Sequence, residues 1–446
     1  MNRLIYRILR FNHALRYWVL TQFTPGGLGL LCAVFACGLI GIDIKRSVSY
    51  QIFTFLVALF IVSVLLLPFS RHRLEVSRVL PRFGTVGIPL FYRIQLHNPN
   101  RRRIGGVKLF EQFPNSFPTF QEFQHVFSRR RELQRSDWFG LLARKQWAYA
   151  PPQHLPSLPS KKGAEITGEL IPLRRGILRF QQIVLACPEP LGFINRRFKV
   201  SLPQSVLVLP KRYQLASIEL PGVSSDQPMG DAIAQSRSRT QGQSNEFRSL
   251  RDYRPGDSPR KIHWKSWAKT GRPIVKEEQD DHTVRHTLIL DTFQKENYSE
   301  ALEESIAIAA SFAYTLQTQQ SLIELVIAGN QAHHFTAGRS LSRTEKLLEL
   351  LASIQPNQKA PFESILSVLR PELAAIGSCI CILLDWDAQR KELIEQLQIA
   401  GVPTLAIVIE GEKGLSADVD RSCLSDRRSR LEVMNINNIQ EALLKL

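Results

Sequence analysis

The segment Ser378–Glu410, SCICILLDWDAQRKELIEQLQIAGVPTLAIVIE, decides the fold of the C-terminal part of this 446-residue chain. It opens with an apolar run typical of a buried strand and continues through RKELIEQLQIAG, which is typical of a helix. A second apolar run, VPTLAIVIE, closes the segment. Strands that alternate with amphipathic helices predict a parallel sheet with helices on both faces.

The same alternation begins earlier in the chain. VRHTLILD predicts a short strand ending at Asp291, and Ser299–Thr318 has the apolar spacing of a helix. The strand SLIELVIAG and the helix KLLELLASI, opened by the capping box SRTE, follow. We therefore predict one α/β domain over residues 282–446. Ligands of such sheets bind at the carboxyl ends of strands, where Asp291, Asp385 and Asp387 are expected.

The middle of the chain has a different pattern. In VGIPLFYRIQLHN, Ile88, Leu90, Tyr92, Ile94 and Leu96 alternate with other side chains, which predicts a half-buried strand. Further strand signals separated by Pro and Gly predict a β-sandwich-like domain over residues 71–210. Residues 211–245 are rich in Ser, Gln and Gly and predict a linker or long loop.

Two apolar segments near the N-terminus predict membrane spans. Gly26–Ile42 contains no charge over 17 residues, and Ser47–Ser70 contains none over 24. We predict two transmembrane helices within residues 26–70, and a signal peptide followed by one anchor is the disfavoured alternative. Arginines flank both outer ends, so residues 1–25 are predicted to be a basic cytoplasmic segment. This predicts a multi-pass protein of the cell membrane with its soluble domains in the cytoplasm.

Charge is distributed unevenly along the chain. Residues 291–446 hold 14 Lys/Arg against 21 Asp/Glu, a net charge of −7. Because the whole chain has a net charge of +17, the preceding 290 residues have a net charge of +24. A basic front favours nucleic acid, an anionic membrane surface or an acidic protein as partner. The six cysteines are scattered without a C-x-x-C pair, which excludes the usual zinc pattern and suits a reducing compartment.

The basic stretch Phe247–Lys276, FRSLRDYRPGDSPRKIHWKSWAKTGRPIVK, has nine Lys/Arg and two Asp with aromatic residues between them. One interpretation is a structural joint, with a turn at Pro255-Gly256-Asp257 and the aromatic side chains packed inward. A second is a docking surface for an acidic protein. Nucleic-acid binding is the third and is disfavoured, because the stretch lies between two domains.

The segment 246–281 also resembles the signature of the domain-of-unknown-function family numbered fifty-eight. The matching positions are Glu246, Phe247, Leu250, Arg251, Tyr253, Pro255, Gly256, Asp257, Arg260, Ile262 and Trp264. Upstream, RRGILRFQQIVLACPEPLGF is similar to a second family segment through Arg175, Gly176, Pro190, Leu191 and Gly192. The residues Cys187-Pro188-Glu189 depart from that family segment, which usually begins with an acidic residue.

The resemblance implies a bacterial membrane protein with a β-rich domain and a von Willebrand factor A-like domain. It also implies association with a MoxR-type AAA+ ATPase and a non-enzymatic adaptor role in assembling or activating other proteins. No P-loop, G-x-S-x-G elbow or H-E-x-x-H helix occurs, which agrees with a protein that is not an enzyme and has no cofactor.

Domains of the von Willebrand type often bind Mg²⁺ through D-x-S-x-S after the first strand. Here the run is Asp291-Thr292-Phe293-Gln294-Lys295, so an apolar ring and a cation stand where a hard cation needs oxygen ligands. We predict a degenerate site without metal, at which Thr292, Asp385 and Asp387 are possible weak ligands. The alternative function is a metal-dependent hydrolase or other enzyme that uses these acids.

Overall fold

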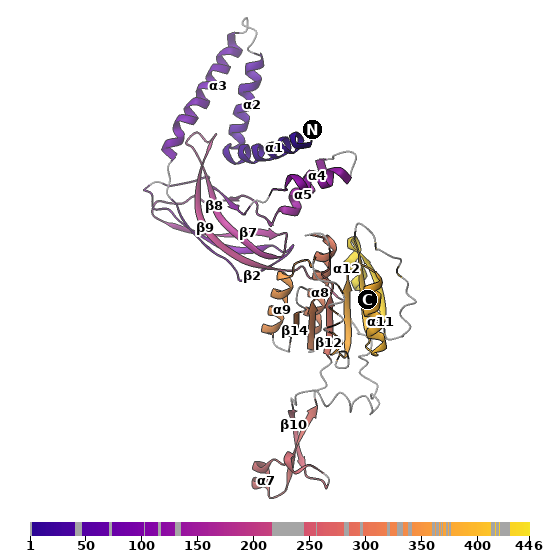
Figure 1. Cartoon of the computed structure of the whole chain (residues 1–446). Coiled ribbons are helices and arrows are strands. Elements are labelled where there is room, and N and C mark those ends of the chain that lie inside the picture. Colours follow the sequence, from indigo (N-terminus) through magenta and orange to yellow (C-terminus); the bar gives the residue numbers. More distant parts are fainter. Residues whose placement is uncertain are drawn as a thin grey trace. The chain divides into compact units, whose positions relative to one another are not determined.

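The computed structural model describes residues 2–40, 47–70, 74–101, 103–114, 117–129, 135–215, 245–255, 257–280, 285–294, 298–318, 322–327, 333–337, 341–358, 376–411 and 429–446, with isolated positions between 362 and 373 and at 415 and 419. The chain divides into two compact units, Met1–Lys211 and Arg212–Leu446 (Figure 1). Most of the predicted linker, residues 216–244, lies outside the described residues.

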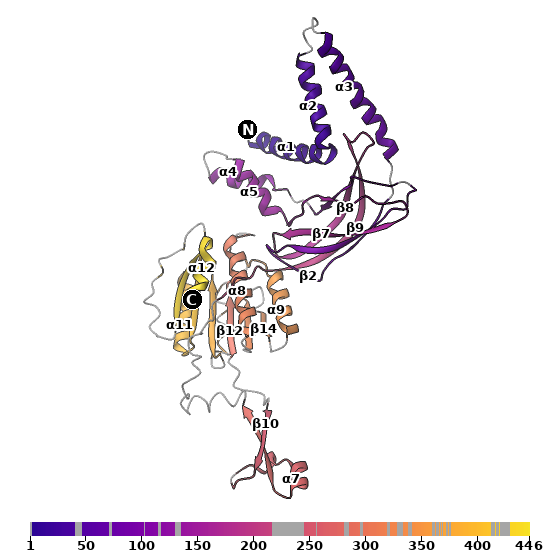
Figure 2. The same cartoon turned by 180° about the vertical axis from the view of Figure 1, so that it is seen from behind.

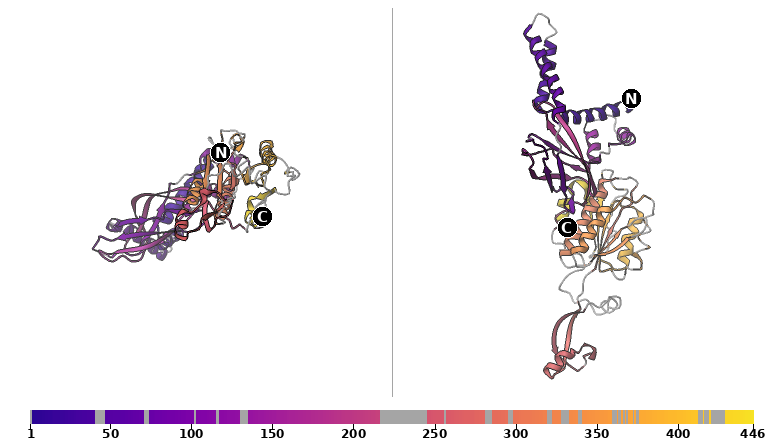
Figure 3. Two further views of the ribbon diagram at one scale, coloured as in Figure 1. Left: turned by 90° about the horizontal axis from the view of Figure 1, so that it is seen from below. Right: turned by 90° about the vertical axis from the view of Figure 1, so that its left-hand side faces the viewer.

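The N-terminal unit begins with three helices. They are α1 (Asn2–Gln22), α2 (Pro25–Ile40) and α3 (Ser47–Leu66), and the short η1 (Leu67–Ser70) follows. Helices α2 and α3 pack against each other, and α1 runs across the foot of α2 (Figures 2 and 3). Two shorter helices, α4 (Phe120–Arg129) and α5 (Arg135–Lys145), lie within the β-rich part.

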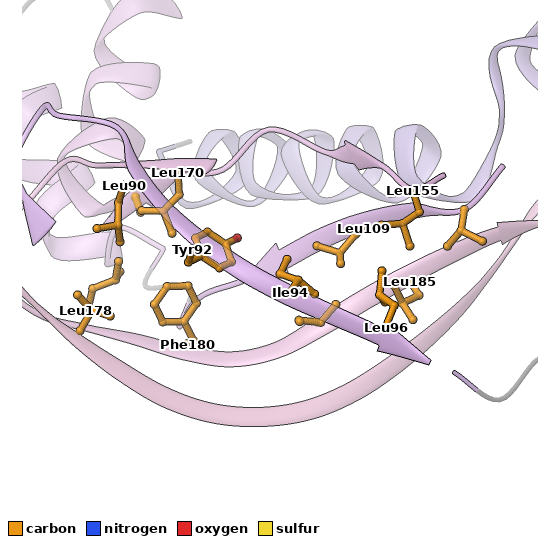
Figure 4. Packing of buried hydrophobic residues seen from close by; sticks show 14 of the residues in the cluster. Leu90, Tyr92, Ile94, Leu96, Leu109, Leu155, Leu170, Leu178, Phe180 and Leu185 are labelled. Atoms are coloured by element: carbon orange, nitrogen blue, oxygen red, sulfur yellow. The ribbon is translucent and has the colours of Figure 1, made fainter. Parts of the chain in front are cut away.

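The strands of this unit form two sheets that share one core. The first has the order β1-β3-β7-β5 and the second the order β2-β9-β8-β4-β6. The strands are β1 (Glu75–Val79), β2 (Phe83–Thr85), β3 (Leu90–His97), β4 (Lys108–Gln112), β5 (Ala148–Tyr149), β6 (Gln153–His154), β7 (Gly163–Pro172), β8 (Gly176–Pro188) and β9 (Asn195–Leu209). Alternate residues of β3 are buried, and they meet Leu178 and Phe180 of β8 (Figure 4). Ile88, which the sequence pattern places in this strand, precedes it and is exposed.

The predicted membrane hairpin is wrong. Within the described residues we find no helix with both the length and the apolar character needed to cross a bilayer. Helix α2 has 16 residues, about 24 Å at 1.5 Å per residue, against a hydrocarbon layer of about 30 Å. The end of α3 is bound to the β-rich part, because Ser63 is buried there and donates a 2.6 Å hydrogen bond to Glu189. The prediction of a multi-pass protein in the cell membrane is corrected with it.

The turn between β8 and β9 joins the helices to the sheets. Glu189 accepts hydrogen bonds from the backbone N–H groups of Leu191, Phe193 and Ile194 as well as from Ser63. Thr24 donates to the carbonyl of Gly192 at 2.5 Å and caps α2 by accepting from the Gly27 N–H at 3.0 Å. The sequence PEPLGF, noted above only for its resemblance, is therefore the anchor for α2 and α3.

Replacing Gly27 with alanine should loosen this anchor. A Cβ at Gly27 would lie 2.0 Å from the Phe193 carbonyl oxygen, so the helix or the turn must shift. We expect Gly27→Ala to lower the free energy of unfolding of this unit by about 1–3 kcal/mol, as overpacking does. Gly29→Ala is the matched control, since nothing lies within 4 Å of its added Cβ. Chemical denaturation of the full chain measures both, and equal stability of the two variants would contradict this account.

The C-terminal unit contains a six-stranded sheet of order β14-β13-β12-β15-β16-β17. Five strands run parallel, and β14 pairs antiparallel with β13 at one edge. The strands are β12 (Arg285–Leu290), β13 (Leu322–Ile327), β14 (His333–Ala337), β15 (Ser378–Leu383), β16 (Thr404–Glu410) and β17 (Arg430–Asn435). The helices are α8 (Glu300–Thr318), α9 (Leu341–Ser353), α11 (Ala388–Ile399) and α12 (Ile439–Leu444).

Helices cover both faces of this sheet. Leu393, Ile394 and Leu397 of α11 share a core with Cys379 and Cys381 of β15. Helix α8 contacts β12, β13, β15 and β16. Since side chains alternate along a strand, the buried Ile380 and Ile382 face the opposite side. The central strands β15 and β16 are therefore buried on both faces, which accounts for their continuous apolar sequences.

Candidate functional site

The strand order places a topological switch point between β12 and β15. From β12 the chain continues to β13 on one side, while β15 lies on the other and leads to β16. At such a point the connections leave a crevice outside the carboxyl ends of the two strands. Asp291 directly follows β12, and Asp385 and Asp387 follow β15, so the structure brings the three predicted acids to the same edge.

Asp291 is fully buried at this edge, and both oxygens of its carboxylate accept hydrogen bonds from the protein. Its Oδ1 accepts the Phe293 N–H at 3.0 Å, and its Oδ2 accepts the Leu384 N–H at 3.0 Å. The same Oδ2 accepts a 2.7 Å hydrogen bond from Nε of Arg390, in the first turn of α11. The guanidinium of Arg390 therefore lies directly beside the carboxylate of Asp291 and balances its charge.

Arg390 also contacts an acidic and an aromatic side chain besides Asp291. Its Nη1 donates to Oδ2 of Asp387 at 2.5 Å, and its guanidinium lies 4.8 Å from the ring centre of Phe362. Burial alone would lower the pKa of Arg390, but the charge of Asp291 and their hydrogen bond, with the charges of Asp387 and Asp385, raise it. The site therefore carries its own permanent cation.

The other predicted ligands also have structural roles. Asp387 is the N-cap of α11 and accepts the Arg390 N–H at 3.0 Å, while Asp385 accepts the Trp386 N–H at 2.7 Å. Thr292 is buried, and its carbonyl accepts the Asn357 N–H at 2.8 Å. Lys295 lies outside the described residues. Over the described parts of the chain, no three His, Cys, Asp or Glu side chains are grouped to hold a metal ion.

The opposite ends of β12 and β15 hold a buried histidine. Nδ1 of His286 lies 2.6 Å from Oγ of Ser378, and burial lowers the pKa of His286 to about 4. In the unfolded chain this group titrates near 6.5, so the unfolded state binds the proton first as pH falls. Stability contributed by neutral His286 is thus complete above pH 6.5 and is lost between about pH 6.5 and 4.

We expect this loss to reach about 3 kcal/mol at pH 4, at about 1.4 kcal/mol per pKa unit. His286→Gln keeps a polar partner for Ser378 without a titrating group, so its stability should vary less with pH in this window. Urea denaturation of both full-length proteins at pH 7 and pH 4.5 measures the difference. Identical pH dependence would show that His286 does not contribute.

The signature segment forms a separate small module. Strands β10 (Asn245–Asp252) and β11 (Ile274–Asp280) pair antiparallel, and η2 (Pro259–Lys261) and α7 (Trp264–Thr270) fill the connection (Figure 1). Asp257 accepts two hydrogen bonds from Arg251, at 2.7 and 2.8 Å, and one from the Arg254 N–H at 2.9 Å. These bonds, with the two arginine charges, lower the pKa of Asp257 to about 2 against a small opposing effect of desolvation. Among the described residues of the matched signature, Arg251 and Asp257 therefore fix the turn.

The aromatic side chains of this module do not all pack inward. Trp264 is 64% exposed and stacks on Trp267, with ring centres 5.2 Å apart and planes inclined by 21°. The expectation of an inward Trp264 is wrong, because the seven-residue α7 buries none of its residues and ends at Gly271 in the left-handed region. Exposed basic residues accompany this pair on the same module: Arg254, Lys261, Lys265, Lys269 and Arg272.

Some predicted signature positions carry less information. Tyr253 and Ile262 are half-buried and Pro255 is exposed. Glu246 and Phe247 lie in β10 and Arg260 in η2, but their side chains are outside the described residues, as is Gly256 entirely. We use the name tryptophan face for the surface of α7 that carries the exposed Trp264, the half-buried Trp267, and the exposed Lys265 and Lys269, which lie about 100° and 140° around the helix axis from Trp264.

Comparison with known proteins supports the resemblance over part of the chain. Residues 249–376 match the model of the family described as "Protein of unknown function DUF58". The "Uncharacterized protein YeaD" of Bacillus subtilis (strain 168) is 23% identical over 192 residues, which are 43% of this chain and 46% of that protein. The chain thus matches about half the length of this curated relative.

The solved structures that match parts of this chain are only weakly similar to it. The protein BatB from Bacteroides thetaiotaomicron is 8% identical and covers 36% of this chain and 97% of its own, with a TM-score of 0.24. A CARDB domain from Pyrococcus furiosus is 14% identical and covers 29% of this chain and 92% of its own, with a TM-score of 0.15. Neither similarity is strong enough to carry an argument about fold or function.

Proposed function

We propose that this chain is a non-enzymatic adaptor that docks an acidic protein through the tryptophan face. The observation that carries the proposal is the exposure of Trp264 while it stacks on Trp267. Tryptophan and arginine are the residues that most often anchor protein interfaces, and a tryptophan that is 64% exposed leaves a large apolar surface in water in the isolated chain.

Charge complementarity supports an acidic partner. The module carries exposed lysines and arginines beside the tryptophans, and its acidic Asp257 is already bound by Arg251. A two-stranded hairpin has little hydrophobic core of its own. Among the described residues of this module, Val275 is the buried hydrophobic residue. Burial of apolar surface against a partner therefore stabilises this module more than it would stabilise a domain with a large core.

The resemblance to family fifty-eight suggests the kind of partner. We propose a MoxR-type AAA+ ATPase, with the α/β domain as a von Willebrand factor A-like domain whose metal position is taken by Arg390. The adaptor would then couple the ATPase to the assembly or activation of other proteins. The alternative of a metal-dependent hydrolase gains no support from the geometry, because both oxygens of Asp291 are bound by protein donors.

Site-directed photocrosslinking tests the proposal. A photoreactive residue is placed at Trp264 in one full-length variant and at Ile399, which is 80% exposed on α11, in another. We expect the Trp264 position to crosslink an AAA+ ATPase and the Ile399 position not to do so. Lys265→Glu with Lys269→Glu should abolish that crosslink. Crosslinks of equal yield from both positions, or none from Trp264, would overturn the proposed docking.

A further inference from the structure

Helix α1 carries an exposed apolar stripe. Its members are between 43% and 65% exposed and follow one another at intervals of four, three, four and three residues: Leu4, Ile8, Phe11, Leu15 and Trp18. This interval is the a/d pattern of a helix that packs along another helix. At 3.6 residues per turn the five side chains cover an arc of about 80°, which is the narrow seam of a coiled coil and less than a broad apolar face.

The opposite face of α1 is already in use. The ring of Tyr6 packs against those of Phe123 and Trp138, with centres 5.6 and 6.1 Å apart, and its hydroxyl donates to the Pro118 carbonyl at 2.8 Å. His13 contacts the ring of Phe117 on the same side. These contacts fix the rotation of α1 about its axis, so the stripe is held outward.

Charge on α1 restricts what can cover the stripe. The helix contains Arg3, Arg7, Arg10 and Arg16 and no Asp or Glu. Arg3 and Arg10 are turned to the packed side, where they lie 5.4 and 5.3 Å from the ring centres of Phe120 and Phe117. A second copy of α1 would offer no carboxylate to the arginine that remains beside the stripe, because the helix has none. Arg7 lies next to the stripe and is exposed, so an acidic flank on the partner would meet it.

We propose that α1 binds an acidic amphipathic helix of another protein along Leu4, Ile8, Phe11, Leu15 and Trp18. This surface is independent of the tryptophan face and gives the adaptor a second docking site. An adaptor needs two such sites, one for each of the proteins that it connects. The partner helix has apolar residues at its a and d positions and carboxylates at the positions beside them.

A synthetic helix tests this proposal in the full-length protein. The probe has about four heptads with Leu at a and d and Glu at e and g, and a second probe has Lys in place of Glu. Fluorescence anisotropy should show binding of the Glu probe and at least tenfold weaker binding of the Lys probe. Phe11→Ser should weaken binding of the Glu probe at least tenfold, as truncation of an interface anchor does.

Asn12→Ser is the matched control. Asn12 is exposed next to Phe11 in the chain but lies off the stripe, so its replacement should change the affinity less than twofold. Equal binding of the two probes would overturn the proposal, and so would unchanged binding by Phe11→Ser. Binding of phosphatidylglycerol vesicles in preference to the Glu probe would assign the stripe to lipid. Self-association that Phe11→Ser removes would assign it to a second copy. These two results also overturn the proposal.

Discussion

Glu111→Ala should lower the free energy of unfolding of the N-terminal unit by about 3–5 kcal/mol, as the loss of one partner of a buried ion pair does. Arg78 and Glu111 lie inside the β-rich core with side chains 0% and 2% exposed and an N–O distance of 2.5 Å. The guanidinium also donates to the side chain of Gln204 at 2.9 Å and to the Leu202 carbonyl at 2.6 Å. Without Glu111 its positive charge would stay buried without a counter-ion.

Tyr92 and Phe180 also contact this buried ion pair. Tyr92 donates to Glu111 at 3.0 Å, and Arg78 lies 4.2 Å from the ring centre of Phe180. Burial raises the pKa of Glu111 in spite of the opposing charge of Arg78. Glu165→Ala is the control, since Glu165 forms an exposed pair with Arg93 at 3.8 Å and should cost less than about 1 kcal/mol. The double variant Arg78→Met, Glu111→Leu should recover most of the loss.

Chemical denaturation of the full chain, followed by the fluorescence change of the N-terminal unit, measures these variants. If Glu111→Ala and Glu165→Ala cost the same, the buried pair is not what stabilises the core. If the double variant is no more stable than Glu111→Ala, the cost does not come from an unpaired charge.

The second large effect is expected at the switch point. Arg390→Ala leaves the buried carboxylate of Asp291 without its cation, so it should destabilise the α/β domain by about 3–5 kcal/mol. Arg430→Ala is the control, because Arg430 is exposed on β17 and its replacement should cost less than about 0.5 kcal/mol. Equal costs would contradict the role of Arg390 as the internal cation.

The same account predicts the response to magnesium. Titration of the wild-type chain with Mg²⁺ in a calorimeter should give no binding heat, because Arg390 already neutralises Asp291. Binding in the micromolar range, about −8 kcal/mol, would restore the metal-dependent enzyme as a candidate.

The alternation of strands and helices in the C-terminal domain could be predicted from the sequence because β12, β13, β15 and β16 each contain an apolar run. The two outer strands, β14 and β17, were not predicted, since HHFTA and RLEVMN are short and contain polar residues. The membrane hairpin was predicted from two apolar segments without charge. Charge-free length does not reveal that α2 is 16 residues long or that Ser63 binds Glu189.

The site was also predictable only in part. The three acids follow predicted apolar strands. Because the carboxyl ends of parallel strands lie at the same edge of a sheet, their placement at one edge could be predicted. Arg390 was missed, although Asp387 three residues earlier is a helix cap that places Arg390 in the first turn. The exposure of Trp264 could not be foreseen, because tertiary packing decides which aromatic residues of a short helix are buried.

The central claim is that the tryptophan face docks an acidic partner. Its most direct measurement is the dissociation constant of the full chain for the AAA+ ATPase that the crosslinking identifies. We predict that Trp264→Ala raises this constant at least about tenfold without changing the unfolding midpoint, while Ile399→Ala leaves it within about twofold. An unchanged constant for Trp264→Ala would contradict the claim.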